Sequence, residues 1–304
     1  MLLNKLRYFA ETTPNEPAFI GRENETNWPT LLHAVEMFKK ALTKFEGKRV
    51  LFHTDGRFKD EMALIIASSE VPGEFILISS FHNLERTTSL MHEFNAEYVV
   101  FPEKGEIRIL AERKPIDAPV FIAEPYIGIL TSGTTGNPKC ARYSWDRLSK
   151  AVAINPKFQN RRWMMSYHIA NFAGLQVFLQ CFCNGGCLVL PRNWPPNSKE
   201  DIDSIVENKI QYLNCTATYS RKIALSIPNA IESQVRSITL GGEVVDQSLI
   251  DILKKKFPLA KIIHIYASTE MGSRIEVKDE LEGFPISVLE RSDIRVFENE
   301  IQLR

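Results

Sequence analysis

Short apolar runs alternate with segments of helical periodicity along most of this chain. Leu31, Val35, Phe38 and Leu42 recur at helical spacing, and an apolar run at residues 50–52 follows them. The same alternation predicts further strands at residues 75–78, 98–101, 126–130, 163–166, 188–190, 211–214, 237–240 and 261–265. Because strands that alternate with helices pair in parallel and need cover on both faces, the pattern predicts an α/β fold with parallel sheets.

Prolines interrupt this alternation between about Glu112 and Tyr126 and divide it into two series. They predict a first α/β subdomain over residues 1–120 and a second over residues 121–285, in keeping with a length of 304 residues. Beyond these, residues 293–297 and 300–304 flank Glu298-Asn299. This pattern predicts an antiparallel hairpin, the start of a small β element at residues 286–304.

The overall charge excludes some classes of partner. Thirty-seven basic residues balance 37 acidic ones, so no global field attracts nucleic acid or an anionic membrane, and any anion site must be local. Residues 1–14 contain no long apolar stretch, and apolar runs such as 62–67 are too short to span a bilayer. We therefore expect a cytoplasmic protein with no nucleic-acid or membrane partner.

Three of the five cysteines lie close enough in sequence to suggest a metal site: Cys181, Cys183 and Cys187. Their spacing matches no familiar zinc pattern, and their neighbours are apolar. Buried, reduced thiols are the favoured interpretation.

Residues 131–139 read Thr-Ser-Gly-Thr-Thr-Gly-Asn-Pro-Lys directly after an apolar run, a pattern typical of a polyphosphate-binding loop. The glycines allow sharp turns, the polar groups can form a concave anion site, and the lysine adds a positive charge; the residues concerned are Thr131, Ser132, Gly133, Thr134, Thr135, Gly136 and Lys139. The alternative is an ordinary Ser/Thr/Gly loop. A P-loop NTPase is not indicated, because Thr134 stands where that motif places its lysine.

Two later loops also follow predicted strands. The first is Gly241-Gly242-Glu243, whose paired glycines permit a flat ligand to lie against the backbone. The second joins an aromatic ring, hydroxyls and a carboxylate: Tyr266, Ala267, Ser268, Thr269 and Glu270. Loops that leave a parallel sheet at the carboxyl ends of its strands can converge on one crevice. A polar turn with a chance carboxylate is the alternative for the second loop taken alone.

In these loops the chain resembles the N-terminal domain of the adenylate-forming superfamily, which includes acyl- and aryl-CoA synthetases, peptide-synthetase adenylation domains and firefly luciferase. The resemblance implies two doubly wound, mainly parallel sheets with helices on both faces. It also implies that the first loop binds the β- and γ-phosphates of ATP, and that residues 241–243 and Tyr266 enclose adenine. Thr269 would contact the α-phosphate and Glu270 would bind Mg²⁺, with Lys139, Thr269 and Glu270 as the catalytic residues.

The activity implied by the resemblance is attack of a substrate carboxylate on the α-phosphorus, which gives an acyl-adenylate and pyrophosphate. Transfer to coenzyme A or a carrier's phosphopantetheine could follow. Tyr167, His168 and Gly174 resemble the segment that lines the family's acid pocket. In amino-acid-activating members an aspartate matches His168, so an acid without an α-amino group is favoured. Tyr167, Phe172 and Tyr219 could line an aryl pocket or could be core residues, and His168 could be a hydrogen-bonded structural histidine.

Three positions depart from the family pattern. Ala267 and Cys140 each stand where the family commonly has a glycine, and Ser144 stands where it commonly has a histidine. The chain ends at Arg304, before the family's ribose-binding aspartate and its C-terminal domain with the adenylation lysine. This departure leaves open a truncated ligase, a half-ligase that works with a separate C-terminal-domain chain, or a non-catalytic protein that binds nucleotide or acid.

Overall fold

The computed structural model describes the whole chain except residues 22–24, 55–57, 80–83, 115–120, 132–137, 192–197, 228–232, 269–271, 292–293, 298–299 and 304. The chain divides into two compact units, Met1–Pro195 and Pro196–Arg304. The predicted division at residue 120 stays a prediction. Strands from either side of it, β4 (Gly73–Ser79) and β7 (Pro125–Thr131), pair in parallel within the first unit.

The first unit contains a six-stranded sheet in the order β6-β5-β3-β4-β7-β8. Its four central strands run parallel, and each edge strand is antiparallel to its neighbour. Besides β4 and β7, its strands are β3 (Arg49–Thr54), β5 (Tyr98–Glu103), β6 (Glu106–Glu112) and β8 (Lys139–Ser144). The edge strands β6 and β8 were not predicted, because their charged residues hide the apolar signal that identifies a buried strand.

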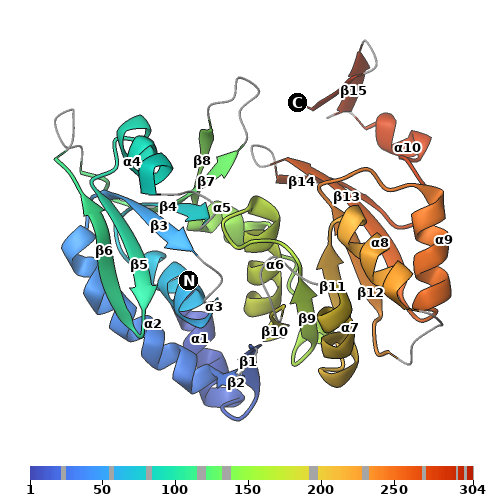
Figure 1. Cartoon of the computed structure of the whole chain (residues 1–304), viewed down its shortest axis with the longest axis horizontal. Coiled ribbons are helices and arrows are strands. Elements are labelled where there is room, and N and C mark those ends of the chain that lie inside the picture. The colour runs from blue at the N-terminus through green and yellow to red at the C-terminus, as the bar shows by residue number, and fades with distance from the viewer. Residues whose placement is uncertain are drawn as a thin grey trace. The chain divides into compact units, whose positions relative to one another are not determined.

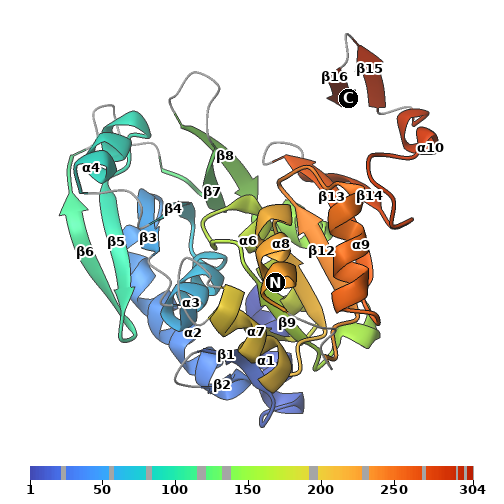
Figure 2. The same cartoon turned by 45° about the vertical axis from the view of Figure 1, so that its right-hand side comes forward.

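Helices cover both faces of this sheet, as Figures 1 and 2 show. α4 (Leu84–Glu93) lies on one face, and α2 (Trp28–Leu42) and α3 (Phe58–Ser68) lie on the other. Right-handed crossovers in the strand order β5-β3-β4 require α3 and α4 to take opposite faces. On the α4 face, Leu51, Ile76, Leu90 and Val99 belong to one buried apolar cluster.

The remaining strands of the first unit follow the order β9-β10-β1-β2. β9 (Arg162–Met165), β10 (Cys187–Val189) and β1 (Pro17–Ile20) are parallel, and β2 (Glu25–Asn27) is antiparallel to β1. The helical segments of this unit not yet given are α1 (Leu2–Thr12), η1 (Thr43–Phe45), α5 (Trp145–Lys150), η2 (Pro156–Phe158) and α6 (Phe172–Cys183). The Ser144 hydroxyl caps α5 by accepting a hydrogen bond from the Arg147 N–H at 3.3 Å.

The second unit contains the strand order β14-β13-β12-β11. β11 (Tyr212–Cys215), β12 (Ser237–Gly241) and β13 (Lys261–Ser268) are parallel, and β14 (Gly272–Val277) is antiparallel to β13. α7 (Ser198–Glu207) precedes β11, and α8 (Ala217–Ser226) and α9 (Gln247–Lys256) connect the parallel strands. Because these strands follow one another in chain order, right-handed crossovers place α8 and α9 on one face, as Figure 2 shows.

The C-terminal segment forms the predicted hairpin. β15 (Ile294–Phe297) pairs with β16 (Glu300–Leu303) in antiparallel register, after the short helix α10 (Ile286–Leu289). Ile294 packs with Ile275 and Val277 of β14. The expected fold class is therefore confirmed: mainly parallel sheets covered by helices, followed by a small antiparallel β element.

Candidate functional site

Three segments of the second unit lie at the same edge of its strands. In the parallel register of β11, β12 and β13, Cys215 lies opposite Leu240 and Leu240 lies opposite His264, while Gly241 lies opposite Ile265. The segments that follow, at residues 216–219, 241–243 and 266–268, therefore share the carboxyl edge. This is the edge at which open α/β sheets bind ligands.

The Gly-Gly-Glu turn is open to a ligand and is tied to its neighbour. Gly242 has a φ of +79°, and a Cβ added there would meet no atom within 4 Å. The Glu243 carboxylate accepts a hydrogen bond from the Thr218 backbone N–H at 2.6 Å. Thr218 lies in the first turn of α8, so the Glu243 carboxylate lies at the N-terminus of this helix. This position is favourable for the negative charge and stabilises both α8 and the turn that carries Glu243.

Tyr266 follows Ile265, the residue that pairs with Gly241 at the same edge. The Tyr266 side chain is 38% exposed. The ring of Phe284 lies edge-on to it, at 5.9 Å between the ring centroids. Residues 266–268 continue β13 and pair with β14, with a register shift between Tyr266 and Ala267. The loop predicted to begin at Tyr266 therefore begins later, because β14 supplies backbone partners. Thr269 and Glu270 lie outside the described residues.

Tyr219 lies at the same edge but points into the interior. Its ring is 8% exposed, and its hydroxyl donates to the carboxylate of Asp201, which is fully buried on α7. Burial, reinforced by the negative charge of Asp201, raises the pKa of the Tyr219 hydroxyl. Sequence reasoning missed Asp201, because nothing in the helical pattern of α7 indicates a partner 18 positions away.

In the first unit, the two flanks of the predicted phosphate loop are paired. Thr131, the last residue of β7, lies opposite Lys139, the first residue of β8. The Thr131 hydroxyl donates to the Lys139 carbonyl at 3.4 Å, and the Lys139 side chain is exposed. Between these flanks, Ser132, Gly133, Thr134, Thr135 and Gly136 lie outside the described residues.

Of the residues expected to line the acid pocket, Tyr167 and His168 follow the end of β9. Tyr167 is 9% exposed and His168 is 3% exposed. The His168 Nδ1 accepts a hydrogen bond from the Ala170 N–H at 3.1 Å. Since a nitrogen that accepts carries no proton, this bond selects the neutral imidazole with its proton on Nε2. Ala170 was not predicted, because a backbone donor leaves no mark in the sequence.

Gly174 and Phe172 belong to the first turn of α6, which packs on this segment. An added Cβ at Gly174 would lie 2.1 Å from the His168 carbonyl oxygen, so the missing side chain allows the close approach. The Phe172 ring is partly buried, 5.5 Å from that of Tyr143. The structure thus brings together Tyr167, His168 and Gly174 in the first unit, and Glu243, Gly241 and Tyr266 in the second.

The cysteines of α6 and β10 are buried. Cys181, Cys183 and Cys187 are each at most 3% exposed. No group of three or more His, Cys, Asp or Glu side chains suited to a metal occurs among the described residues. Burial raises the pKa of the Cys187 thiol to about 12 and that of Cys183 to about 11, so both are protonated at neutral pH.

In the described part of the chain, every helix is too short or too polar to cross a bilayer.

The sequence is similar to one curated protein, the nonribosomal peptide synthetase sidE of Aspergillus fumigatus, with 21% identity over 265 residues. The match covers 83% of this chain and 12% of that protein, so the chain spans about an eighth of the relative's length.

Solved structures share the fold at low sequence identity. The N-terminal subdomain of Klebsiella oxytoca NpsA, in complex with 3-hydroxyanthranilyl-AMSN, has a TM-score of 0.75 at 13% identity, covering 92% of this chain and 75% of that one. The o-succinylbenzoate CoA synthetase of Bacillus subtilis, in complex with its acyl-adenylate intermediate, has a TM-score of 0.72 at 16% identity, covering 91% of this chain and 61% of that one. The sequence also matches the AMP-binding enzyme family over residues 47–285, most of its length. The chain therefore belongs to the AMP-binding, adenylate-forming enzyme family.

Proposed function

We propose that this protein activates a carboxylic acid with ATP, forming an acyl-adenylate and releasing pyrophosphate. The observation that carries the proposal is the family match over residues 47–285, which includes all three predicted ligand loops. The shared carboxyl edge of residues 241–243 and Tyr266 supports it, because that edge is where a parallel sheet binds nucleotides.

Adenine binds against the second unit in this proposal. The half-exposed ring of Tyr266 offers a face for stacking, and the open side of Gly242 leaves room for a flat base beside the backbone. Gly241, Glu243, Ala267 and Ser268 complete this part of the site. The hydrogen bond from Thr218 to Glu243 keeps the turn in place before the nucleotide arrives.

The phosphates bind to the loop between Thr131 and Lys139. The two flanks of this loop lie opposite each other, as the ends of β7 and β8. The Lys139 side chain is exposed and supplies a positive charge at the end of this loop. In the proposal, Thr269 would contact the α-phosphate and Glu270 would bind Mg²⁺. When bound, the cation would neutralise part of the negative charge of the phosphates.

The reaction brings two anions together, since a carboxylate attacks the negatively charged α-phosphate. Hydrogen-bond donors, here the backbone and hydroxyl groups of residues 131–136 with Lys139, offset that repulsion and stabilise charge on the departing pyrophosphate. The electron pair of one carboxylate oxygen forms the new P–O bond as the bond to pyrophosphate breaks. No protein nucleophile is required.

The acid we propose is an aryl or acyl acid without an α-amino group. His168 is buried and neutral in its hydrogen-bonded tautomer, so it provides no fixed negative charge to pair with an ammonium group. Tyr167 and Phe172 provide aromatic surface near it. Tyr219, whose hydroxyl donates to Asp201 within the second unit, stays a predicted lining residue.

A second step, transfer of the acyl group to the thiol of coenzyme A or phosphopantetheine, completes the proposal. An acyl-carrier protein is the corresponding partner for transfer to phosphopantetheine.

Acid-dependent exchange of labelled pyrophosphate into ATP tests the proposal. We expect exchange with one or more aryl or aliphatic acids, and none with the matched α-amino acids. The assay is run on the chain alone and with a separately expressed C-terminal domain of a relative added. No exchange in either condition, over a broad panel of acids, would reject the proposed activity.

A further inference from the structure

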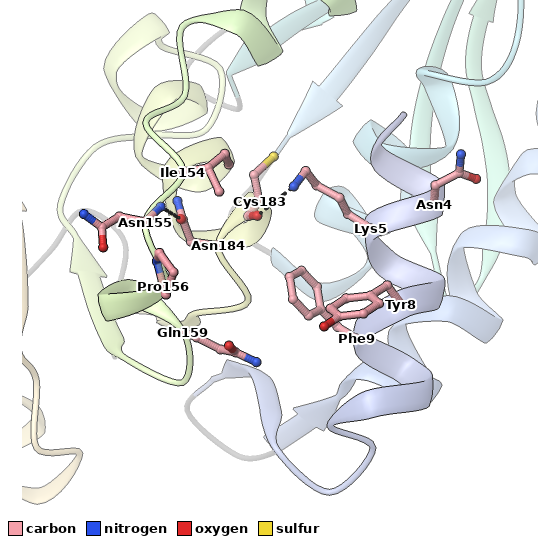
Figure 3. A pocket seen from close by; sticks show the side chains of 10 residues that line it. All are labelled: Asn4, Lys5, Tyr8, Phe9, Ile154, Asn155, Pro156, Gln159, Cys183 and Asn184. Atoms are coloured by element: carbon pink, nitrogen blue, oxygen red, sulfur yellow. Dashed lines mark hydrogen bonds between the residues drawn. The ribbon is translucent and has the colours of Figure 1, made fainter.

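A second concave site lies in the first unit, lined by α1 and by the turn before β9. It is a cavity of about 400 Å³, within the range of small-molecule pockets. Figure 3 shows Lys5, Tyr8 and Phe9 of α1 on one side, with Ile154, Pro156 and Gln159 on the other. η2 precedes β9 and Asn184 precedes β10, so this cavity lies at the amino ends of the strands, opposite the edge that carries His168.

The walls of the cavity are fixed by the protein itself. The Asn184 side chain donates to the carbonyls of Ala153 and Gln180 at 3.1 and 2.7 Å, and accepts from the Asn155 N–H at 2.8 Å. Gln180 adds two hydrogen bonds to Ala153, at 3.1 and 2.6 Å. These hydrogen bonds hold the turn against α6. The cavity is therefore preformed before a ligand binds.

The floor is apolar and closely packed. Phe9 is 6% exposed and its ring occupies the space beside Gly185, where an added Cβ would lie 2.6 Å away. Around this floor, Tyr8 and Ile154 are 56% and 59% exposed. An apolar ligand group would therefore have one buried ring beneath it and two accessible side chains at its sides.

One positive charge lies in this cavity. The Lys5 ammonium donates to the Cys183 carbonyl at 3.1 Å, which uses one of its three donors and orients the head group. Among the residues that the structure describes, no carboxylate forms an ion pair with Lys5. No described residue forms a hydrogen bond with the side-chain amide of Gln159. The cavity thus combines a fixed cation, an amide donor and an apolar floor.

We infer that this cavity binds a small organic anion, with a carboxylate or phosphate on Lys5 and an apolar body of about one ring on Phe9. Lys5 supplies charge and two remaining donors to either oxyanion. The inference does not depend on the proposed activation reaction, because it involves the opposite ends of the strands.

Fluorine NMR with three matched probes tests the site: 4-fluorobenzoate, 4-fluorophenyl phosphate and the neutral 4-fluorobenzamide. The two anions should bind more tightly than the amide, and comparison of the two distinguishes a carboxylate from a phosphate preference. Lys5→Gln should weaken anion binding by about fivefold and leave amide binding unchanged. Lys40→Gln, an exposed lysine of α2, is the matched control and should change nothing.

A second variant separates this cavity from the acid pocket. Ile154→Glu places a carboxylate at an exposed rim position, where it should compete with the anions for Lys5 without unfolding the protein. Weaker binding of the anions in both variants supports the inference. Anion binding that neither variant changes lies elsewhere and overturns it, as does the absence of binding by any probe or a preference for the amide.

Discussion

The carbonyl oxygen of His168 lies only 2.1 Å from where a side chain on Gly174 would begin. The first turn of α6 therefore packs directly on the backbone that carries His168, and the neighbouring atoms are main-chain atoms that cannot rotate away. The absence of a side chain six positions later allows this close approach.

Gly174→Ala should destabilise the protein by about 1–3 kcal/mol, because overpacking against backbone forces the segment to shift. An ordinary glycine-to-alanine change inside a helix has the opposite sign and stabilises by about 0.5–1 kcal/mol. Urea denaturation measures the free energy of unfolding. An unchanged or increased stability would show that the contact is not restrictive.

Tyr219→Phe should lower the free energy of unfolding by about 1–3 kcal/mol, because it removes a donor from the fully buried Asp201 carboxylate. Tyr219→Phe combined with Asp201→Asn should recover part of the loss, since the buried charge is gone. If Tyr219→Phe were neutral in urea denaturation yet changed which acid binds, the hydroxyl would belong to the acid pocket instead.

Asp246 caps α9, and its pKa is lowered by hydrogen bonds from the Ser248 hydroxyl and the Leu249 N–H and by the nearby Arg221. A carboxyl group with a lowered folded-state pKa stabilises the protein fully above its usual value of 3.8, and this stabilisation disappears as pH falls through the folded-state pKa. Asp246→Asn should therefore cost more stability at pH 7 than at pH about 2–3. Thermal unfolding measured across this range checks it; an equal cost at both ends would contradict the assignment.

Tyr266→Ala should weaken ATP binding by about 5–150-fold, the effect of losing about 1–3 kcal/mol of base stacking. Tyr266→Phe keeps the ring and should bind nearly as well as the original protein. Leu259→Ala, at another exposed position of the second unit, serves as the control. Equal affinities for all three variants in calorimetry would remove Tyr266 from the nucleotide site.

The central parallel strands were predictable, because β3, β4 and β7 are buried apolar runs bounded by turn residues. α1 was missed although Leu2, Leu6 and Phe9 recur at helical spacing and are buried, a signal that was present in the sequence. β1 and β2, of four and three residues, are too short for periodicity to identify.

The candidate site divides in the same way. Glycines and hydroxyls beside apolar runs indicate a ligand loop locally, which is how residues 131–139 and 241–243 were found. Long-range partners cannot be found in this way. The contacts of Glu243 with Thr218 and of Tyr219 with Asp201 depend on how α7, α8 and β12 pack, and no local pattern encodes them.

Calorimetric titration with a non-hydrolysable aroyl-sulfamoyl adenosine tests the central claim most directly, because this molecule joins the proposed adenine, phosphate and acid sites. We predict that it binds on the order of a hundredfold or more tightly than ATP or the free acid, and more tightly than its aminoacyl counterpart. Failure of both adenylate analogues to bind would contradict an adenylate-forming site in this chain. Tighter binding of the aminoacyl analogue would contradict the assignment of an acid without an α-amino group.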